Sequence, residues 1–420
     1  MNIVRLALAY LRYRLATTSL NILLLVFGVA TIATVVIVAH QIRERVSREI
    51  AGIDLVVGAE GSPLQLILAA VFQIDAPTGN IPLAEAEFLR RHPLVASAVP
   101  IAMGDSVSGF RIIGTEPALL SERNARLARG RLWERAMEAV LGAQVARATG
   151  LDVGASFVGV HGLHGGLAHA EHPYTVVGVL APTGTVLDRL VFTSLESVWL
   201  VHERPRPSVA RGAPAEHEHE EHHEHEEHPA SSEKRISREG AEITALFVRY
   251  RSPLAAVQLP RLVNERPNLQ AASPALEAAR LLAILGFGLD TLRLFGVVVT
   301  AVAALSVLVA LAHALEERRA DIAIMRVLGA TRGLVVRELL LEALLLGAAG
   351  LVLGLALAHL SVELLARSFR QVHEAGITGG TIAPEELWLV PAVLALGVLA
   401  ALFPAVRAYR LDLASTLARA

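Results

Sequence analysis

The sequence has no cysteine and a single lysine, and each scarcity excludes a class of site. Without cysteine, no disulfide can brace an exported domain and no thiolate-ligated zinc site can form. The lysine, Lys234, lies in the segment SSEKRIS, which lacks the glycine spacing and the following apolar helix of a phosphate-binding loop. A standard ATP site needs such a lysine, so any ATP that drives this protein is hydrolysed by a separate subunit.

Charge is also scarce in this sequence. Charged residues make up 19% of the chain and the formal net charge is −2, which argues against nucleic acid as a partner. Hydrophobic residues, by contrast, make up 53% of the 420 residues. That composition indicates a membrane protein.

The first long apolar segment is Leu15–Ala39, which has 25 residues and no charge. At 1.5 Å per residue it exceeds the hydrocarbon core of a bilayer, about 30 Å thick. The apolar core of a signal peptide usually spans only about 7 to 15 residues, so a retained membrane helix is favoured over a cleaved leader. Arg5, Arg12 and Arg14 precede the segment and place the N-terminus in the cytoplasm.

Three more apolar segments are long enough to span a membrane, namely Leu294–Leu315, Leu339–Leu365 and Leu387–Val406. Arginines concentrate between the second and third predicted helices and follow the fourth, which places both chain ends in the cytoplasm. The sequence therefore predicts a membrane α-helical protein with four transmembrane helices. An extracytoplasmic α+β domain lies between helices 1 and 2.

The predicted domains follow from these segments. Residues 1–39 are the cytoplasmic N-terminus and first membrane helix, residues 40–285 are the extracytoplasmic domain, and residues 286–420 carry membrane helices 2 to 4. Strand-like and helical patterns alternate in residues 40–285. The predicted strands are Asp54–Val57, Val95–Ala102, Phe110–Gly114, Tyr174–Leu180, Arg189–Thr193 and Ile243–Tyr250. The predicted helices are Leu83–Arg91, Ala139–Thr149, Leu195–Glu203 and Ala255–Asn264.

The turn between the second and third membrane helices has an amphipathic pattern. Residues Glu316–Leu328 combine an apolar stripe with charged positions, which suits a short helix along the membrane face. Gly329 then ends this helix and Thr331 can cap the next one. On chemistry alone, a solvated turn between two helices explains the segment equally well.

The same stretch carries a resemblance to a known family. The run AIMRVLGATRGLVVRELLLEALLLGAAGLVLG resembles the permease signature of the MacB/FtsX-like group of ABC transporters. The closing segment PAVRAYRLDLASTLARA, Pro404–Ala420, is similar to the end of that family's permease domain, with Leu413 where proline is common. A weaker similarity covers Gly130–Phe157, where Gly142 opens a helix and Gly150 and Gly154 shape the turn after it.

This resemblance implies a fold, a partner and a mechanism. It implies a permease of the type VII ABC class in the bacterial inner membrane, a homodimer that binds a separate ABC ATPase and moves its periplasmic domain by mechanotransmission. The permease itself is then no enzyme, and ATP is bound by the partner subunit only. The implied ATPase-coupling residues are Glu316, Glu317, Arg318, Arg319, Asp321, Met325, Arg326, Leu328, Gly329, Ala330 and Thr331.

Histidine is the second strong chemical signal. Eleven of the 16 histidines lie between His161 and His228, and ten of these are in a glycine-rich segment and in the acidic tract of residues 216–228. Imidazole is a common ligand of zinc, nickel and copper, and no cysteine competes with it here. The candidate metal ligands are His161, His164, His169, His172, His217, His219, His222, His223, His225 and His228. The tract lacks the fixed spacing of a structural site, so we expect loose capture of Zn²⁺; an acidic, solubilising linker is the alternative.

Small residues mark one face of the third membrane helix. Gly347, Gly350 and Gly354 are the candidate packing positions, and the last two have the small-xxx-small spacing that lets another helix approach closely. The partner helix would belong either to a second copy or to the same chain.

Three functions are compatible with these features. The first is an ABC permease for transition-metal handling, in particular of zinc, which works with a periplasmic metal-binding or effector protein. The second is an FtsX-like regulator of a periplasmic cell-wall hydrolase. The third is an export or lipoprotein-extraction permease in which the histidine loop is incidental.

Overall fold

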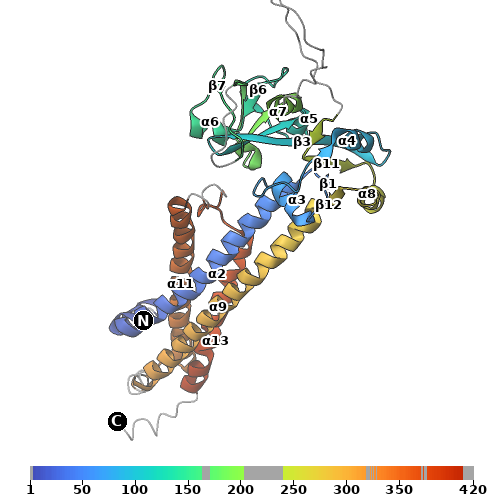
Figure 1. Cartoon of the computed structure of the whole chain (residues 1–420). Helices are drawn as coiled ribbons and strands as arrows, with labels where there is room; N and C mark the ends of the chain where they lie inside the picture. The colour runs from blue at the N-terminus through green and yellow to red at the C-terminus, as the bar shows by residue number, and fades with distance from the viewer. Residues whose placement is uncertain are drawn as a thin grey trace, which may run out of the picture. The chain divides into compact units, whose positions relative to one another are not determined.

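The structure is a computed structural model that describes residues 3–162, 171–202, 240–317, 322, 324, 326–327, 329–369, 372 and 376–409. The chain forms two compact units (Figure 1). The membrane unit comprises Met1–Val46 and Arg280–Ala420, and the α/β unit comprises Ser47–Ala279. The sequence predicts the middle domain over residues 40–285, a few residues wider at each end.

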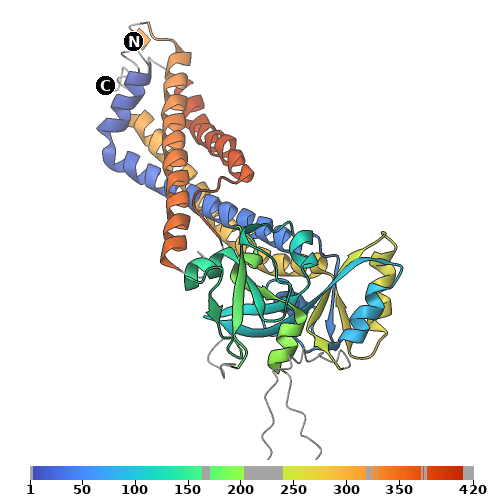
Figure 2. The same cartoon turned by 90° about the horizontal axis from the view of Figure 1, so that it is seen from above.

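The membrane unit is built from helices (Figure 2). They are α1 (Ile3–Tyr13), α2 (Leu15–Ile50), α9 (Pro274–Glu317), α11 (Arg332–Ser368), the 3-10 helix η2 (Pro384–Trp388) and α13 (Leu389–Tyr409). The long ones are α2, α9, α11 and α13. Among the described residues, four helices are long and apolar enough to cross a membrane: α2, α9, α11, and η2 with α13. The predicted fold class, four transmembrane helices and an α+β domain between the first two, is confirmed.

Small residues let the membrane helices pack closely within the chain. A Cβ atom on Gly350 of α11 would lie 2.6 Å from Cβ of Leu25 in α2, and one on Gly354 would lie 2.7 Å from Cβ of Val29. Both contacts are tighter than real side chains allow, so these two positions require glycine. The small-xxx-small face of α11 therefore packs against α2 of the same chain. The third candidate, Gly347, faces α13 instead, where an added Cβ would lie 3.8 Å from the carbonyl oxygen of Val393.

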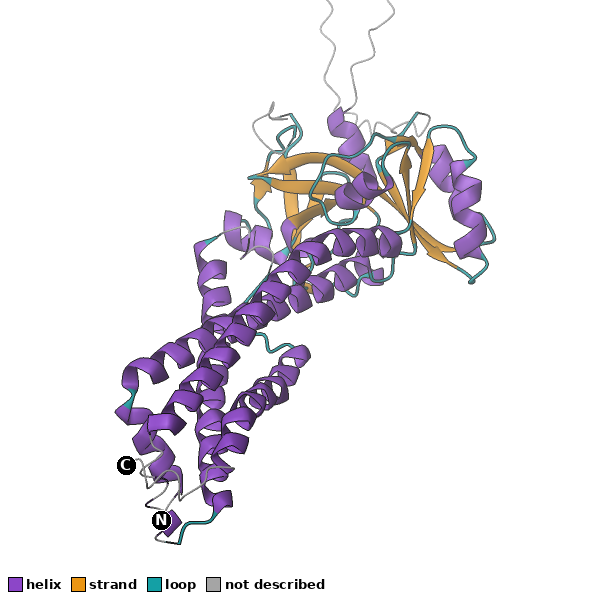
Figure 3. Cartoon of the chain, turned by 90° about the horizontal axis from the view of Figure 1, so that it is seen from below, coloured by secondary structure: helices purple, strands orange, loops and turns teal. Residues whose placement is uncertain are grey.

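Strands occur in the α/β unit and, within the described residues, ten of them form one mixed sheet (Figure 3). Its order is β12-β1-β11-β3-β4-β9-β6-β8-β5, with β7 paired to β8. The strands are β1 (Leu55–Ala59), β3 (Val95–Val107), β4 (Phe110–Thr115), β5 (Leu127–Gly130), β6 (Glu138–Leu141), β7 (Ser156–Phe157), β8 (Tyr174–Leu180), β9 (Leu190–Thr193), β11 (Ala245–Tyr250) and β12 (Leu269–Ala272). A small second sheet pairs β2 (Ile81–Pro82) with β10 (Glu242–Ile243).

Short helices cover this sheet and close its cores. They are α3 (Pro63–Ala70), α4 (Leu83–Arg90), α5 (Ala118–Glu122), α6 (Ala143–Thr149), the 3-10 helix η1 (Val186–Arg189), α7 (Leu195–His202) and α8 (Ala255–Asn264). Figure 1 shows α8 beside β12 and α6 at the other end of the sheet, beside β6 and β7. The strand β3, 13 residues long, contributes buried side chains to three separate hydrophobic clusters.

One predicted element is wrong in part. The sequence predicts a single helix over Ala139–Thr149, but Glu138–Leu141 is strand β6 and the helix begins only at Ala143. The strand lies between β8 and β9, and Ala139, Val140 and Leu141 are fully buried. A strand buried on both faces has no alternating pattern, so its short apolar run reads like part of a helix. Gly142 opens the helix as predicted, and Gly150 closes it with φ +72°.

Candidate metal centre

The candidate centre begins with Asp105, near the end of β3. The register of β3 against β4 shifts between Met103 and Ser106, and such bulges re-aim side chains. The Asp105 side chain is only 1% exposed. A buried carboxylate is costly unless opposite charge, hydrogen bonds or a metal compensate it.

The segment after β7 brings a histidine to this carboxylate. Ser106 and Val160 exchange two backbone hydrogen bonds of 2.9 and 2.8 Å, and the Ser106 hydroxyl donates to the carbonyl of Gly162 at 2.5 Å. These contacts fix the backbone on both sides of His161. Its Nδ1 atom lies 3.4 Å from Oδ1 of Asp105, and 65% of its side chain is exposed.

Helix α7 brings the second histidine. His202 is the last residue of α7, and its Nε2 atom lies 3.5 Å from the same Asp105 oxygen. Its Nδ1 lies 2.8 Å from the carbonyl of Val198, which can only accept, so Nδ1 carries a proton and donates it. In the neutral ring, the lone pair is then on Nε2, on the side of Asp105. The two imidazole centroids are 5.4 Å apart.

Two glycines allow these elements to meet. A Cβ on Gly159 would lie 2.9 Å from Oδ2 of Asp105, and one on Gly104 would lie 3.2 Å from Cγ1 of Val198 in α7. Side chains at either place would push the segment or the helix away from β3. The meeting of Asp105, His161 and His202 therefore depends on small residues at both contacts.

A buried tyrosine lies near enough to Asp105 to feel its charge. Tyr174 is 1% exposed and stacks on Phe157, with ring centroids 5.3 Å apart. Burial raises the pKa of Tyr174, and the charge of Asp105 raises that pKa further. The phenol of Tyr174 therefore stays neutral.

One ligand atom from each of Asp105, His161 and His202 lies within 4.8 Å of the other two. Such a set can hold a divalent transition metal. Of the predicted ligands, the structure brings only His161 into this cluster; His172 is described but is not part of it. The other eight, His164, His169, His217, His219, His222, His223, His225 and His228, lie outside the described residues. Sequence reasoning missed Asp105 and His202, because neither belongs to a histidine-rich tract.

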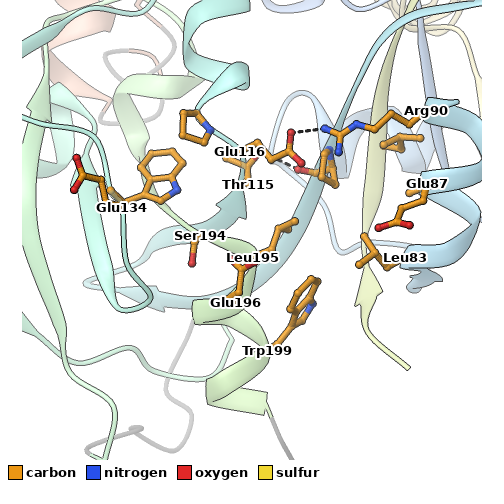
Figure 4. A pocket seen from close by; sticks show the side chains of 15 residues that line it. Leu83, Glu87, Arg90, Thr115, Glu116, Glu134, Ser194, Leu195, Glu196 and Trp199 are labelled. Carbon is orange, nitrogen blue, oxygen red and sulfur yellow. Dashed lines mark hydrogen bonds and ion pairs between the residues drawn. The ribbon is translucent and has the colours of Figure 1, made fainter. Parts of the chain in front are cut away.

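A separate cavity of about 380 Å³ lies elsewhere in the α/β unit (Figure 4). Helix α7 lines it with Leu195, Glu196 and Trp199, and α4 contributes Arg90. In Figure 4, Arg90 and Glu116 point toward each other, and they form an ion pair. The charged residues of the lining are four glutamates and one arginine, so the cavity favours a cationic group over an anionic one.

The predicted coupling segment is described only in part. Glu316 and Glu317 end α9, where Glu316 lies 3.3 Å from Arg407 of α13 and Glu317 pairs with Arg14. Gly329 has φ +100°, as expected of a residue that ends a helix, and Thr331 occupies the N-cap position of α11 without a side-chain cap. Arg326 and Ala330 are also described, whereas Arg318, Arg319, Asp321, Met325 and Leu328 lie outside the described residues.

The end of α2 is anchored in the α/β unit. Glu49 is buried in that unit, accepts the backbone N–H of Val186 at 2.8 Å, and lies 3.5 Å from Arg123. Arg123 also donates to the carbonyls of Glu49 and Ala51, at 2.7 and 2.8 Å. Burial lowers the pKa of Arg123, and the negative charge of Glu49 offsets part of that decrease. Helix α2 thus ends in a buried, hydrogen-bonded ion pair.

Two family models match the chain. A MacB-like periplasmic core domain matches residues 18–220, and an FtsX-like permease C-terminal domain matches residues 293–413. A comparison with curated protein sequences gives no match.

Three solved structures are similar to part of this chain. The periplasmic region of MacB from Actinobacillus actinomycetemcomitans is 12% identical, with a TM-score of 0.34, over 56% of this chain and 95% of that one. The extracellular domain of the noncanonic ABC-type transporter YknZ from Gram-positive bacteria is 12% identical, with a TM-score of 0.31, over 53% and 99%. A domain of a putative permease protein from Porphyromonas gingivalis is 14% identical, with a TM-score of 0.27, over 53% and 88%.

The four candidate spans and the domain between the first two define a multi-pass membrane protein with a periplasmic-type domain. With both family models matched in this order, the chain belongs to the MacB/FtsX-like family of ABC transporter permeases. Permeases of this family work with an ABC ATPase and are not themselves enzymes.

Proposed function

We propose that this chain is the membrane subunit of an ABC complex in which a separate ATPase drives movement of the α/β unit, and that the complex handles transition metals, in particular zinc. Two copies of the chain bind two copies of the ATPase. Both chain ends and the turn between α9 and α11 face the cytoplasm, and the α/β unit works on the periplasmic side of the inner membrane.

The proposed movement of the α/β unit rests on one observation, which is that α2 and α9 are long and unbroken. They have 36 and 44 residues, or about 54 and 66 Å at 1.5 Å per residue, against a hydrocarbon core of about 30 Å. Each has its outer end, Ser47–Ile50 and Pro274–Ala279, in the α/β unit. Because an unbroken helix resists bending, a displacement at one end of the membrane span reaches the other end. The buried pair of Glu49 and Arg123 then fastens α2 to the domain it moves.

The opposite end of α9 is placed to receive a displacement from the ATPase. Glu316 and Glu317, its last residues, pair with Arg407 of α13 and with Arg14 between α1 and α2. A force applied to this end of α9 is therefore also transmitted to α13 and to the junction of α1 and α2. The predicted coupling residues follow directly in the chain, between α9 and α11, which supports ATPase docking there.

The metal part is supported by the chemistry of the α/β unit. Eleven of the 16 histidines lie between residues 161 and 228, and the chain has no cysteine. Nitrogen and carboxylate ligands without thiolates suit exchangeable capture of Zn²⁺, since imidazole binds zinc as a neutral ligand and releases it as the ring is protonated. The candidate cluster of Asp105, His161 and His202 adds a defined arrangement to the two histidine-rich tracts.

A spin-label experiment tests the coupling. Since the chain has no cysteine, Arg91→Cys supplies a single attachment point at the end of α4, where the native side chain is 83% exposed. The labelled permease is reconstituted in lipid nanodiscs with the ABC-type ATPase that co-purifies with it, and the distance between labels on the two copies is measured by electron resonance. We expect a shift in this distance on addition of ATP, which reverses after hydrolysis.

A variant and a control test whether the buried pair of Glu49 and Arg123 transmits the movement. Arg123→Ala should reduce the ATP-dependent shift while ATP is still hydrolysed, because the end of α2 is no longer fastened. Arg249→Ala, a surface change on β11, should leave it as in the parent protein. A distance that stays constant in a complex that hydrolyses ATP would refute the proposed movement.

A further inference from the structure

We propose that Asp105, His161 and His202 bind one Zn²⁺ ion in a three-ligand site with its fourth position open to solvent. The choice of ion rests on the proposed metal-handling function, whereas the site itself rests on the geometry of three described side chains. It is distinct from the acidic histidine tract of residues 216–228, since its three ligands all lie outside that tract.

The distances match the edges of a zinc coordination sphere. In tetrahedral zinc sites the Zn–N and Zn–O bonds are about 2.0–2.2 Å, so two ligand atoms are about 3.4 Å apart. The observed separations from Oδ1 of Asp105 are 3.4 Å to His161 and 3.5 Å to His202. A direct charge-assisted hydrogen bond would be shorter, about 2.7–2.9 Å. Two of the three separations therefore match those of ligands around a common zinc ion, and the two histidine nitrogens lie within 4.8 Å of each other.

The contact of His202 with Val198 selects, in the neutral ring, the tautomer that a metal needs. Its Nδ1 donates to the carbonyl of Val198, which leaves the Nε2 lone pair on the side of Asp105. Ligating histidines in metal sites almost always donate their other ring nitrogen in this way, because the contact fixes the tautomer and the ring orientation. Val198 belongs to the same helix one turn earlier, so α7 supplies both the ligand and its support.

The ligand set selects the class of metal and its mode of binding. Two imidazole nitrogens and one carboxylate favour Zn²⁺ and its neighbours over Mg²⁺ or Ca²⁺, which prefer oxygen ligands. Asp105 is buried, but 36% of the His202 side chain and 65% of the His161 side chain are exposed. A closed structural site has four protein ligands, whereas three ligands at a solvent-facing rim leave a position for water or a donor from a metal carrier.

The bound ion would join three segments that are far apart in the sequence. They are the bulged end of β3, the segment after β7 and the C-terminal end of α7. The same helix lines the cavity of Figure 4 through Leu195, Glu196 and Trp199. Metal occupancy would therefore hold in place a helix that also lines this cavity.

The test uses the full chain in detergent with residues 216–228 deleted, so that the acidic histidine tract does not mask a single site. Co²⁺ serves as a spectroscopic probe for zinc, because tetrahedral Co²⁺ absorbs visible light far more strongly than octahedral Co²⁺. We expect one equivalent of Co²⁺ with intense visible bands, which Zn²⁺ displaces. His161→Ala and His202→Ala should weaken binding by about 100-fold or more, since even supporting residues of metal sites contribute about 10–100-fold.

His172→Ala is the matched control, because His172 lies in the same histidine-rich segment but outside the cluster. It should bind Co²⁺ like the parent protein. His161 is exposed, so its replacement leaves the fold intact and any loss of binding reports on the ligand. Absence of the intense bands, or bands that survive His161→Ala and His202→Ala, would overturn the site.

Together, the Co²⁺ titration and the spin-label experiment separate the site from the proposed function. Binding of one metal by a complex without an ATP-dependent movement supports the site and contradicts the function. ATP-dependent movement in a protein that binds Co²⁺ only through residues 216–228 supports the mechanical part of the function and contradicts the site.

Discussion

The carboxylate of Glu49, one residue before the end of α2, accepts the backbone N–H of Val186 at 2.8 Å. Val186 opens η1, a turn that the sequence places far from α2. The turn is itself held by Asp188, whose two carboxylate oxygens accept the N–H groups of Thr183 and Gly184 at 2.8 and 2.9 Å. One carboxylate thus ties the long helix to a rigid turn of the α/β unit, while Arg123 neutralises its charge.

Removing Arg123 should therefore destabilise the α/β unit. In Arg123→Ala the buried carboxylate of Glu49 loses its ion-pair partner, and breaking a buried pair in this way costs about 3–5 kcal/mol. We expect a melting temperature lower by roughly 6 °C or more, measured by thermal unfolding of the full chain in detergent. Arg91→Ala, which removes an exposed pair with Glu87, should shift the melting temperature far less. Equal shifts in the two variants would show that the Glu49 contact is not a stabilising one.

Acid should weaken the turn before β6 through one carboxylate. Hydrogen bonds from the Arg131 side chain, together with the backbone N–H groups of Glu134 and Arg135, lower the pKa of Glu138 from 4.5 to about 2. Because the folded pKa is below the unfolded one, the stabilisation is complete above pH about 4.5 and is lost as the pH falls through about 2. Glu138→Gln should flatten the decrease of melting temperature between these pH values. A parallel decrease in both proteins would assign the acid sensitivity to other groups.

The sequence predicts the membrane architecture well because its signal is local. An uncharged run of 25 residues, Leu15–Ala39, identifies a membrane helix by length alone, and α2 contains it. The charged residues after His40 predict a continuation of this helix that ends at Gly52, and α2 indeed extends to Ile50, which contacts a buried cluster. The basic segment before the first span becomes helix α1, which composition alone did not predict.

The candidate metal centre could be predicted from the sequence only in part. His161 could be identified because histidines crowd its neighbourhood in the sequence. Asp105 and His202 could not, since one is a single acid in a strand and the other a single histidine at a helix end. A β-bulge, the bridge between Ser106 and Val160, and two close contacts at glycines bring the three together. These are tertiary features, which no spacing along the chain encodes.

Packing of α11 on α2 should be intolerant of side chains at Gly354. In Gly354→Val, the added atoms would lie within 2.8 Å of Val29 and close to the carbonyl of Val26, so the helices must separate. We expect a loss of about 1–3 kcal/mol, as for other overpacked sites, seen as a lower melting temperature and a smaller monodisperse fraction in size-exclusion chromatography.

Gly286→Ala is the matched control for this packing. Gly286 lies within helix α9, and a Cβ added there meets nothing within 4 Å. Alanine is favoured over glycine in a helix by about 0.8–1.0 kcal/mol, so this variant should be neutral or more stable. If Gly354→Val were as stable as Gly286→Ala, the close approach of α11 to α2 would be refuted.

Zinc should slow hydrogen exchange in α7. An ion held by His202 opposes the local opening of this helix, and protection rises with the ratio of free metal to Kd, to about 100-fold at 100 times Kd. Exchange detected by mass spectrometry should show slowing in Leu195–His202 when Zn²⁺ is added to the chain without residues 216–228. Helix α8, Ala255–Asn264, is the internal reference, because none of the three ligands lies on it. Slowing in both helices would indicate a general stabilisation of the α/β unit, whereas slowing that persists in His202→Ala would show that α7 is not held through this ligand.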